Sequence, residues 1–314
     1  MGQPKTMILD TDPGYDDAVA LLLACGASAL RVVGITAVAG NASVEKTFEN
    51  ARRLVGFLRM NIPVARGCDR PLVRKLITAP QVHGETGLDG VELPPAPWVG
   101  EERHAVQFLI DTVRGAEGPM ELVTLGPLTN VALALRLAPD IRERITRIVM
   151  MGGSTSGGNI TPAAEFNIYV DPEAAQIVFE AGVSITMVGL NVTNRAVFTQ
   201  EDVTVLEGRG PASRLAARIL TEYMRRTRRP GRPEGARMHD PLAVAVAVDP
   251  TLVRTESLRV EVETAGARTV GQTVVDLHRV GPEPPNADVA LDVDLPRFKE
   301  FVFETLKALD AHLG

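Results

Sequence analysis

Residues 7–23 read MILDTDPGYDDAVALLL. A short apolar segment and a longer one flank four aspartates, which are Asp10, Asp12, Asp16 and Asp17. Both apolar segments are suited to burial, the first as a strand and the second as a helix. Close carboxylates raise one another's pKa unless a positive charge neutralises them. The stretch therefore predicts a strand, a tight turn at Pro13-Gly14 and a helix that together present acidic groups to a cation.

Short β-branched runs alternate with helical patterns over the first two-thirds of the chain. Strands are expected at 6–9, 30–38, 120–125, 145–151 and 183–190. Helices are expected at 16–25, 43–59, 104–115, 128–137 and 171–181. This alternation predicts an α/β fold, with a mostly parallel sheet covered by helices on both faces.

The last third of the chain has a different pattern. In order, it predicts a helix at 212–228, a loop at 229–237, a helix from Pro241 to Val248, an antiparallel hairpin of 257–263 with 269–277, and a final helix at 296–313. The arginine-rich run 225–237 is expected to be a solvated helix end and loop. No composition break divides the chain, so we expect one α/β domain over residues 1–314 with a small β-rich appendage.

Composition limits the possible partners. The 314 residues carry a net charge of -6, whereas nucleic-acid-binding domains are usually basic, so no nucleic-acid partner is expected. No apolar run reaches the roughly 18 residues of a membrane span, and no signal peptide is evident. The two cysteines form neither a disulfide framework nor a zinc pattern. A cytoplasmic location without membrane contact is therefore expected.

Unusual polar residues follow the expected strands. Ligands of open α/β sheets bind outside the carboxyl ends of the strands. Those ends lead into the Asp cluster, Gly40-Asn41, Gly126–Asn130 and Gly152–Ser154, with Asn159, Glu165 and Asn167 further on. Glu165 and Asn167 are two residues apart and can point the same way from an extended segment. Several amides and carboxylates beside a metal would suit a polyhydroxylated ligand such as a sugar.

The acidic cluster suits a hard cation. Ca²⁺ accepts irregular shells of about 6–8 oxygen ligands. An EF-hand is excluded, because Tyr15 and Leu21 stand where its glycine and glutamate would be. Helix capping by Asp12 and dipole stabilisation by Asp16 and Asp17 compete with metal binding, but they do not account for all four aspartates.

Two histidines are candidates for chemistry. His239-Asp240-Pro241 places a group that titrates near neutrality at a helix start. Capping by Asp240 alone is a competing interpretation, since Asp-Pro recurs at 171–172 and 249–250. His83 lies in a loop where an imidazole has no evident packing role. Phosphate-binding loops and the G-x-S-x-G serine motif are absent from the sequence.

The stretch DTDPGYDD at 10–17 resembles the N-terminal signature of the nucleoside hydrolases, the inosine–uridine preferring group and its pyrimidine-specific ribonucleoside hydrolase relatives. Further segments resemble that family in the same order over roughly residues 5–245, namely Ala39-Gly40-Asn41, Leu125–Asn130, Met150–Gly153, Asn159, Glu165-Phe166-Asn167 and His239-Asp240. The fold that the resemblance implies is the Rossmann-like nucleoside hydrolase fold.

The resemblance implies Ca²⁺-dependent hydrolysis of the N-glycosidic bond of inosine- or uridine-type ribonucleosides, giving free base and ribose with inversion. It implies that calcium is held by Asp12, Asp17, Asp240 and the main-chain carbonyl of Leu125. Asp12 is also the implied base for the attacking water, and His239 the implied acid for the leaving base. Asp10 is expected to brace the turn from behind the metal ligands.

The resemblance also assigns substrate contacts. The ribose hydroxyls and 5′-OH are implied to be held by Asp16, Asn41, Asn159, Glu165, Asn167, Asp240 and the main chain at Met151. His83 and Tyr223 are expected near the base, where several relatives have aromatic residues; one turn after Tyr223 the chain has Thr227. Purine or pyrimidine preference stays open. Relatives are commonly homotetramers, sometimes dimers, so a homo-oligomer is expected.

Two alternatives compete with this assignment. Asp10-Thr11-Asp12 after a strand also resembles the D-x-D of haloacid-dehalogenase-like phosphatases, although Gly14 departs from that motif. A non-catalytic nucleoside- or sugar-binding sensor on the same scaffold would have no need of His239 or of a water-activating Asp12.

Overall fold

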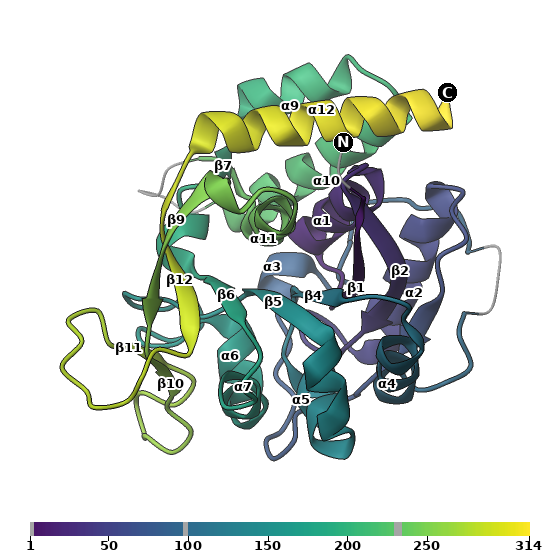
Figure 1. Ribbon diagram of the computed structural model, residues 1–314. Helices are drawn as coiled ribbons and strands as arrows, with labels where there is room; N and C mark the ends of the chain where they lie inside the picture. The colour runs from purple at the N-terminus through teal and green to yellow at the C-terminus, as the bar shows by residue number, and fades with distance from the viewer. Residues whose placement is uncertain (1–2, 97–99, 229–233) are drawn as a thin grey trace.

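The computed structural model describes residues 3–96, 100–228 and 234–314 (Figure 1). Its centre is an eight-stranded sheet in the order β3 (Val64–Arg66), β2 (Leu30–Ala37), β1 (Lys5–Thr11), β4 (Met120–Thr124), β5 (Ile145–Met151), β6 (Ile185–Val188), β12 (Ala287–Val293) and β9 (Val253–Leu258). Neighbouring strands pair in parallel except β12 with β9. The expected α/β class with a mostly parallel sheet is confirmed.

Helices cover both faces of this sheet (Figure 1). One hydrophobic cluster joins the sheet to α1 (Tyr15–Gly26), α2 (Val44–Phe57), α9 (Gln200–Glu207), α10 (Pro211–Thr227), α11 (His239–Val248) and α12 (Leu295–Leu313). The cluster on the other face contains α4 (Ala105–Gly115), α5 (Thr129–Leu137) and α7 (Pro172–Phe179). The expected strands and helices are present, with small shifts at their ends.

The apolar run after the Asp cluster forms a central helix. In α1, every residue from Tyr15 to Leu23 is buried, because the helix lies between the sheet and the outer layer of α10 and α12 (Figure 1). A helix that is apolar on all sides requires such a position. The first turn of α1, with its two aspartates, is therefore held inside the protein.

The C-terminal third contains a strand of the main sheet that the sequence did not predict. β12 was not expected, yet it inserts beside β6 and carries β9 as the sheet edge. Its alternation is broken by a register shift between Ala290 and Asp292, and such an irregularity obscures the period-two signal. The expected segment 257–263 is divided, since it ends β9 and then forms β10 (Val260–Val262), which pairs with β11 (Thr273–Val275). The appendage is thus a two-stranded ribbon.

Short elements lie around the carboxyl ends of the strands. They are α3 (Pro80–His83), α6 (Phe166–Val170), α8 (Leu190–Thr193), the pair β7 (Val197–Phe198) with β8 (Ala236–Arg237), and two 3-10 turns, Pro139–Arg144 and Pro250–Leu252. Part of the expected loop 229–237, residues 229–233, lies outside the described residues.

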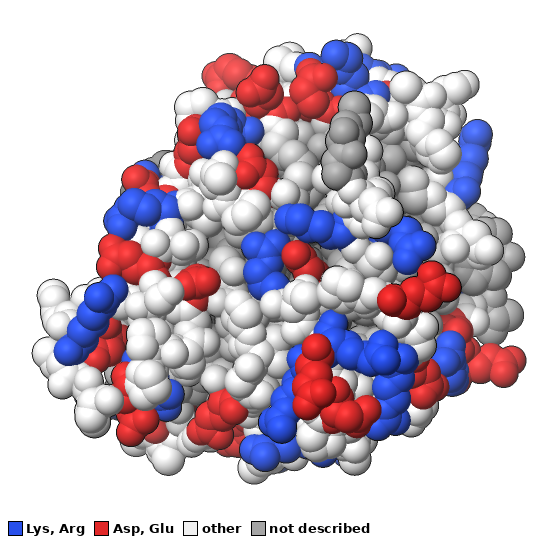
Figure 2. All heavy atoms as spheres, in the orientation of Figure 1, with Lys and Arg blue, Asp and Glu red and all other residues white. Residues whose placement is uncertain are grey.

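Charge is mixed over the surface that Figure 2 shows, with acidic and basic side chains interspersed. This face therefore has no broad positive tract, within the residues described, of the kind that nucleic-acid-binding proteins use. No helix in the described part of the chain is both long and apolar enough to cross a membrane.

Candidate active site

A cavity of ≈ 190 Å³ opens at the carboxyl ends of the central strands. Eleven residues singled out from the sequence line it: Asp16, Asn41, His83, Leu125, Met151, Asn159, Glu165, Asn167, Tyr223, His239 and Asp240. The other three, Asp10, Asp12 and Asp17, are buried and do not line it. The structure therefore brings segments from residue 16 to residue 240 into one place.

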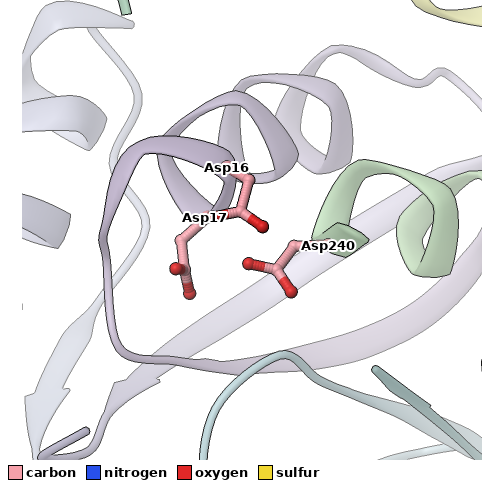
Figure 3. Close-up of side chains that lie close together, drawn as sticks. All are labelled: Asp16, Asp17 and Asp240. Carbon is pink, nitrogen blue, oxygen red and sulfur yellow. The ribbon is translucent and has the colours of Figure 1, made fainter. Parts of the chain in front are cut away.

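Three carboxylates converge at this cavity. Asp16 and Asp17 come from the first turn of α1 and Asp240 from the first turn of α11, and each offers an oxygen within 4.8 Å of the other two (Figure 3). Burial, and then repulsion by Asp17, raises the pKa of Asp16 to about 8. Burial and the neighbouring aspartates likewise raise the pKa of Asp240 well above its usual value. A cation between them would offset both costs, so this group could hold a metal ion.

Hydrogen bonds within the protein hold the carboxylate of Asp17 in place. Its Oδ1 accepts the Thr11 hydroxyl at 2.7 Å, and its Oδ2 accepts the main-chain N–H of Gly14 at 3.0 Å and Nδ2 of Asn41 at 2.9 Å. The Pro13-Gly14 turn is thereby tied to the carboxylate that follows it. Asn41 joins this network from the loop after β2.

Asp12 is fully buried and does not line the cavity. Its Oδ2 accepts the main-chain N–H of Asn41 at 2.7 Å, whereas its Oδ1 is buried and has no hydrogen-bond partner among the described residues. A Cβ at Gly40 would lie 2.1 Å from Oδ2, and one at Gly126 would lie 2.4 Å from Oδ1. Two glycines are therefore needed for the main chain to approach this carboxylate.

Of the three side chains expected from the sequence as metal ligands, Asp17 and Asp240 lie close together. The set of mutually close carboxylates contains Asp16 with Asp17 and Asp240, and Asp12 is not in it. The Leu125 carbonyl accepts Nδ2 of Asn167 at 2.6 Å. The hard oxygen donors and the unpartnered Oδ1 of Asp12 nevertheless suit a cation such as Ca²⁺.

Asp10 lies behind the cluster, on β1. Its Oδ1 accepts the Thr36 hydroxyl and Nδ2 of Asn130, the latter at 2.8 Å, while its Oδ2 is buried without a partner among the described residues. Burial raises the pKa of Asp10 to about 7 against the lowering effect of these two bonds. Because Asn130 also accepts the main-chain N–H of Cys68 at 2.9 Å, Asp10 links β1 to β2, to the start of α5 and, through Asn130, to the loop after β3.

Glu165 lines the cavity and is the N-cap of α6. Its Oε1 accepts the main-chain N–H of Asn167 at 3.0 Å, and its Oε2 accepts those of Gly153 and Ile168. Burial raises the pKa of Glu165 to about 7. Oδ1 of Asn159, another residue that lines the cavity, accepts the main-chain N–H of Phe166 at 2.9 Å, which orients the Asn159 amide.

Three rings stack beside the cavity. The centroids of Tyr15, His83 and Tyr223 lie 5.8–6.0 Å from one another, with interplanar angles of 20–27°. Nδ1 of His83 accepts the main-chain N–H of Tyr15 at 3.1 Å, so the imidazole satisfies an unpaired donor at the start of α1. Burial lowers the pKa of His83 to about 4, which keeps the ring neutral. His83 and Tyr223 also line the cavity, so these two rings could contact a planar ligand group.

His239 also lines the cavity. Its Nδ1 lies 2.7 Å from the Thr193 hydroxyl. Burial, and then the charge of Arg237, lowers the pKa of His239 to about 3. The side chain of Asp240, the next residue, points toward those of Asp16 and Asp17 (Figure 3).

Several cavity residues were not singled out from the sequence. They are Ala79, Gln81, Val82, Ile160, Phe166, Asn194, Arg226 and Arg237. The two arginines correct the expectation that the arginine-rich run is simply solvated. Arg226 forms a 3.0 Å ion pair with Asp89 and lines the cavity, and Arg237 lines it as well. Apart from Phe166, which lies within the segment Glu165-Phe166-Asn167, no local signal marks these residues, because their place depends on how segments distant in sequence pack together.

Fold and cavity together define an α/β enzyme whose acidic pocket suits a small polyhydroxylated ligand carrying a planar group. The sequence model described as inosine-uridine preferring nucleoside hydrolase matches residues 7–300. The chain is 44% identical over 305 residues to the pyrimidine-specific ribonucleoside hydrolase RihA of Photobacterium profundum, covering 96% of this chain and 98% of that protein. RihA of Escherichia coli O1:K1 matches with the same identity and coverage.

Solved structures of nucleoside hydrolases are also similar to this chain. The purine-preferring ribonucleoside hydrolase from Gardnerella vaginalis superimposes with a TM-score of 0.90 at 35% identity, covering 98% of this chain and 99% of that one. The chain therefore belongs to the inosine-uridine preferring nucleoside hydrolase family, and it is a ribonucleoside hydrolase. This result confirms the family resemblance and does not favour the phosphatase or the sensor.

Proposed function

We propose that this protein hydrolyses the N-glycosidic bond of uridine- and inosine-type ribonucleosides with the aid of Ca²⁺, giving free base and ribose. The observation that carries the proposal is the carboxylate of Asp12, which is buried beside the acidic group and keeps one oxygen without a partner among the described residues. An uncompensated buried carboxylate is costly unless a ligand satisfies it.

We propose Asp12, Asp17, Asp240 and the Leu125 carbonyl as the metal ligands. Bound Ca²⁺ would lower the pKa of water and help to orient the ribose. Asn167 now donates to the Leu125 carbonyl, so its amide would have to shift or share that oxygen. The proximity of Asp16 to Asp17 and Asp240 favours a contact of Asp16 with the ribose at the edge of the same site.

The chain's own residues support a direct displacement. Asp12 is the proposed base, since its free Oδ1 can take a proton as the water oxygen bonds to the anomeric carbon. The C–N bond breaks and its electron pair leaves with the base, beside His239. His239 is the proposed donor to that base: its ring N–H protonates the base as it leaves, and the proton that Asp12 took from water then restores the ring through solvent, so that nucleoside and water give ribose and base. Attack from the side opposite the base inverts the anomeric carbon.

The sugar is proposed to lie among Asp16, Asn41, Asn159, Glu165, Asn167, Asp240 and the main chain of Met151. Buried carboxylates around it would stabilise the positive charge that develops on the ring as the bond breaks. Asp10 braces the floor through its hydrogen bonds to Thr36 and Asn130. The stack of His83 and Tyr223 is proposed to receive the base.

A substrate panel tests this proposal. Uridine, cytidine, inosine and adenosine are incubated with the purified protein and Ca²⁺, and free base and ribose are separated by chromatography. The pyrimidine-specific names of relatives that are 44% identical favour uridine and cytidine. No base release from any of the four, at micromolar enzyme, would sink the proposal. Phosphate release from a phosphomonoester would favour the phosphatase, and binding without turnover the sensor.

We also propose an assembly state and a location. A homo-oligomer, a tetramer or a dimer, follows from analogy with the family, and light scattering after gel filtration tests it. A cytoplasmic location is in keeping with Cys25 and Cys68, which are both free thiols.

A further inference from the structure

One hydrogen bond connects two segments that meet only through folding. The Thr193 hydroxyl lies 2.7 Å from Nδ1 of His239, across 46 residues of sequence. Thr193 is the last residue of α8, which follows β6, and His239 is the first residue of α11. Thr193 is completely buried, whereas the His239 ring lines the cavity. The contact therefore joins the protein interior to the wall of the site.

The hydrogen of the Thr193 hydroxyl determines which nitrogen of His239 carries a proton. A buried hydroxyl hydrogen needs an acceptor. Among the described residues, the only hydrogen bond of the Thr193 hydroxyl is the one to Nδ1 of His239. The hydroxyl must therefore donate and Nδ1 must accept. A neutral imidazole that accepts at Nδ1 carries its hydrogen on Nε2.

We propose that Thr193 is a positioning residue for hydrolysis: it selects the tautomer of His239 and holds its ring so that the Nε2–H is available to the base of the bound ribonucleoside. Nε2 has no hydrogen-bond partner of its own among the described residues, and the ring lines the cavity. The Nε2–H of His239 can thus donate to an acceptor on the departing base, such as a pyrimidine carbonyl oxygen or a purine ring nitrogen. This inference rests on the proposed function.

Other polar groups near His239 do not replace Thr193. Arg237 and His83 are close enough to act on the ring electrostatically. Among the described residues, however, no hydrogen bond joins the Arg237 guanidinium to the His239 ring, and the one contact of Nδ1 is with the Thr193 hydroxyl. Nδ1 of His83 is already engaged by the N–H of Tyr15. Within the described chain, the orientation of His239 depends on the one hydroxyl.

Two variants at position 193 separate the effect of the hydroxyl from the effect of the side-chain shape. Thr193→Val keeps the branched shape and removes the hydroxyl, whereas Thr193→Ser keeps the hydroxyl. Thr305→Val, at a buried threonine of α12 away from the cavity, is the matched control for loss of a buried hydroxyl. Each protein is assayed with uridine, whose base is a poor leaving group, and with a nitrophenyl riboside, whose leaving group needs no donor.

We expect Thr193→Val to lower kcat with uridine about 10- to 100-fold, a part of the about 10²–10⁴ that general acid catalysis supplies, and to change turnover of the nitrophenyl riboside less than about threefold. Thr193→Ser and Thr305→Val should stay near wild type with both substrates. Equal losses on both substrates would show a structural role, and unchanged uridine turnover would show no role; either overturns the inference.

Nuclear magnetic resonance gives a readout without turnover. In protein with ¹⁵N-labelled histidine at neutral pH, the His239 signals, assigned by their loss in His239→Gln, should show a bare Nδ1 and a protonated Nε2. A protonated Nδ1 in wild type would overturn the inference even if Thr193→Val failed to fold. If wild-type protein hydrolyses no ribonucleoside, the proposed function fails, and this spectrum still decides whether Thr193 sets the tautomer.

Discussion

The main-chain N–H of Asn41 donates to Oδ2 of Asp12 at 2.7 Å and leaves Oδ1 of that carboxylate without a partner among the described residues. One oxygen is therefore held by the loop after β2, and the other is available for a proton or a cation. Such a division is what a carboxylate needs if it is to act as a base in a fixed position.

Asp12→Asn should remove catalysis and keep the fold. An amide of the same shape cannot take a proton from water, so we expect kcat/KM with uridine to fall by at least about 10³-fold, within the range for loss of a general base. The metal-free variant should be no less stable than wild type, because one buried like charge is removed. Steady-state kinetics and thermal unfolding measure both effects. A loss of less than tenfold would contradict the assigned role.

Chelation should abolish activity, and Ca²⁺ should restore it. A ligand that binds only the folded state stabilises it, by about 2.7 kcal/mol at 100 times its dissociation constant, so Ca²⁺ should also raise the Tm. Asp17→Asn and Asp240→Asn should each weaken Ca²⁺ binding at least tenfold in calorimetric titration. Asp69→Asn, at an exposed carboxylate, is the control.

Asp16→Asn tests how the acidic group divides its tasks. If Asp16 contacts the ribose, this variant should bind Ca²⁺ nearly as well as wild type and raise KM. If it loses Ca²⁺ as strongly as Asp17→Asn, Asp16 is a metal ligand, and the ligand set expected from the sequence is wrong.

Parts of the site could be predicted because their causes are local. The strand, the Pro-Gly turn and the first turn of α1 arise from one continuous stretch, and the Asp cluster is visible in it. Glu165 and Asn167 are likewise close in sequence, and they line the cavity together. The carboxyl ends of parallel strands then bring these segments to one edge.

Other parts depend on distant packing. Thr193 is an ordinary threonine in sequence, and its importance comes from α8 lying against the start of α11. Arg237 lines the cavity because β8 pairs with β7. β12 is stabilised by β6 on one side and β9 on the other. Its register shift obscures the alternation of apolar and polar residues from which a strand is predicted.

The metal-free protein should lose stability as pH rises through neutrality. The pKa values of Asp10 and Glu165 are raised to about 7 and that of Asp16 to about 8, from 3.8, 4.5 and 3.8. The folded state therefore holds more protons than the unfolded state between about pH 4 and 8, and the free energy of unfolding falls over that window. The contribution is fully present below about pH 4 and lost above about pH 8.

Urea unfolding of chelated protein between pH 5 and pH 8.5 measures this slope. Excess Ca²⁺ should flatten it, because the cation favours the charged form of nearby carboxylates such as Asp16. Asp10→Asn should also reduce it by removing one of the titrating groups. If the urea midpoint of the metal-free protein instead rose between pH 6 and pH 8, the result would contradict raised pKa values for these buried carboxylic acids.

Gly14→Ala should act through His83. A Cβ at Gly14 would lie 2.2 Å from Nδ1 of His83, the atom that accepts the Tyr15 N–H. The ring would have to move, leaving that buried N–H unsatisfied at a cost of about 1–3 kcal/mol and disturbing the stack with Tyr223. We expect a lower urea midpoint and a higher KM for uridine.

A double-mutant cycle with His83→Ala tests the cause. With the ring already removed, the added methyl group at position 14 meets no imidazole, so Gly14→Ala should cost much less stability in the His83→Ala background than in wild type. Coupling of this kind is expected for residues in direct contact. Additive losses would mean that the methyl group acts on the main chain of the Pro-Gly turn, and that the position of His83 does not depend on Gly14.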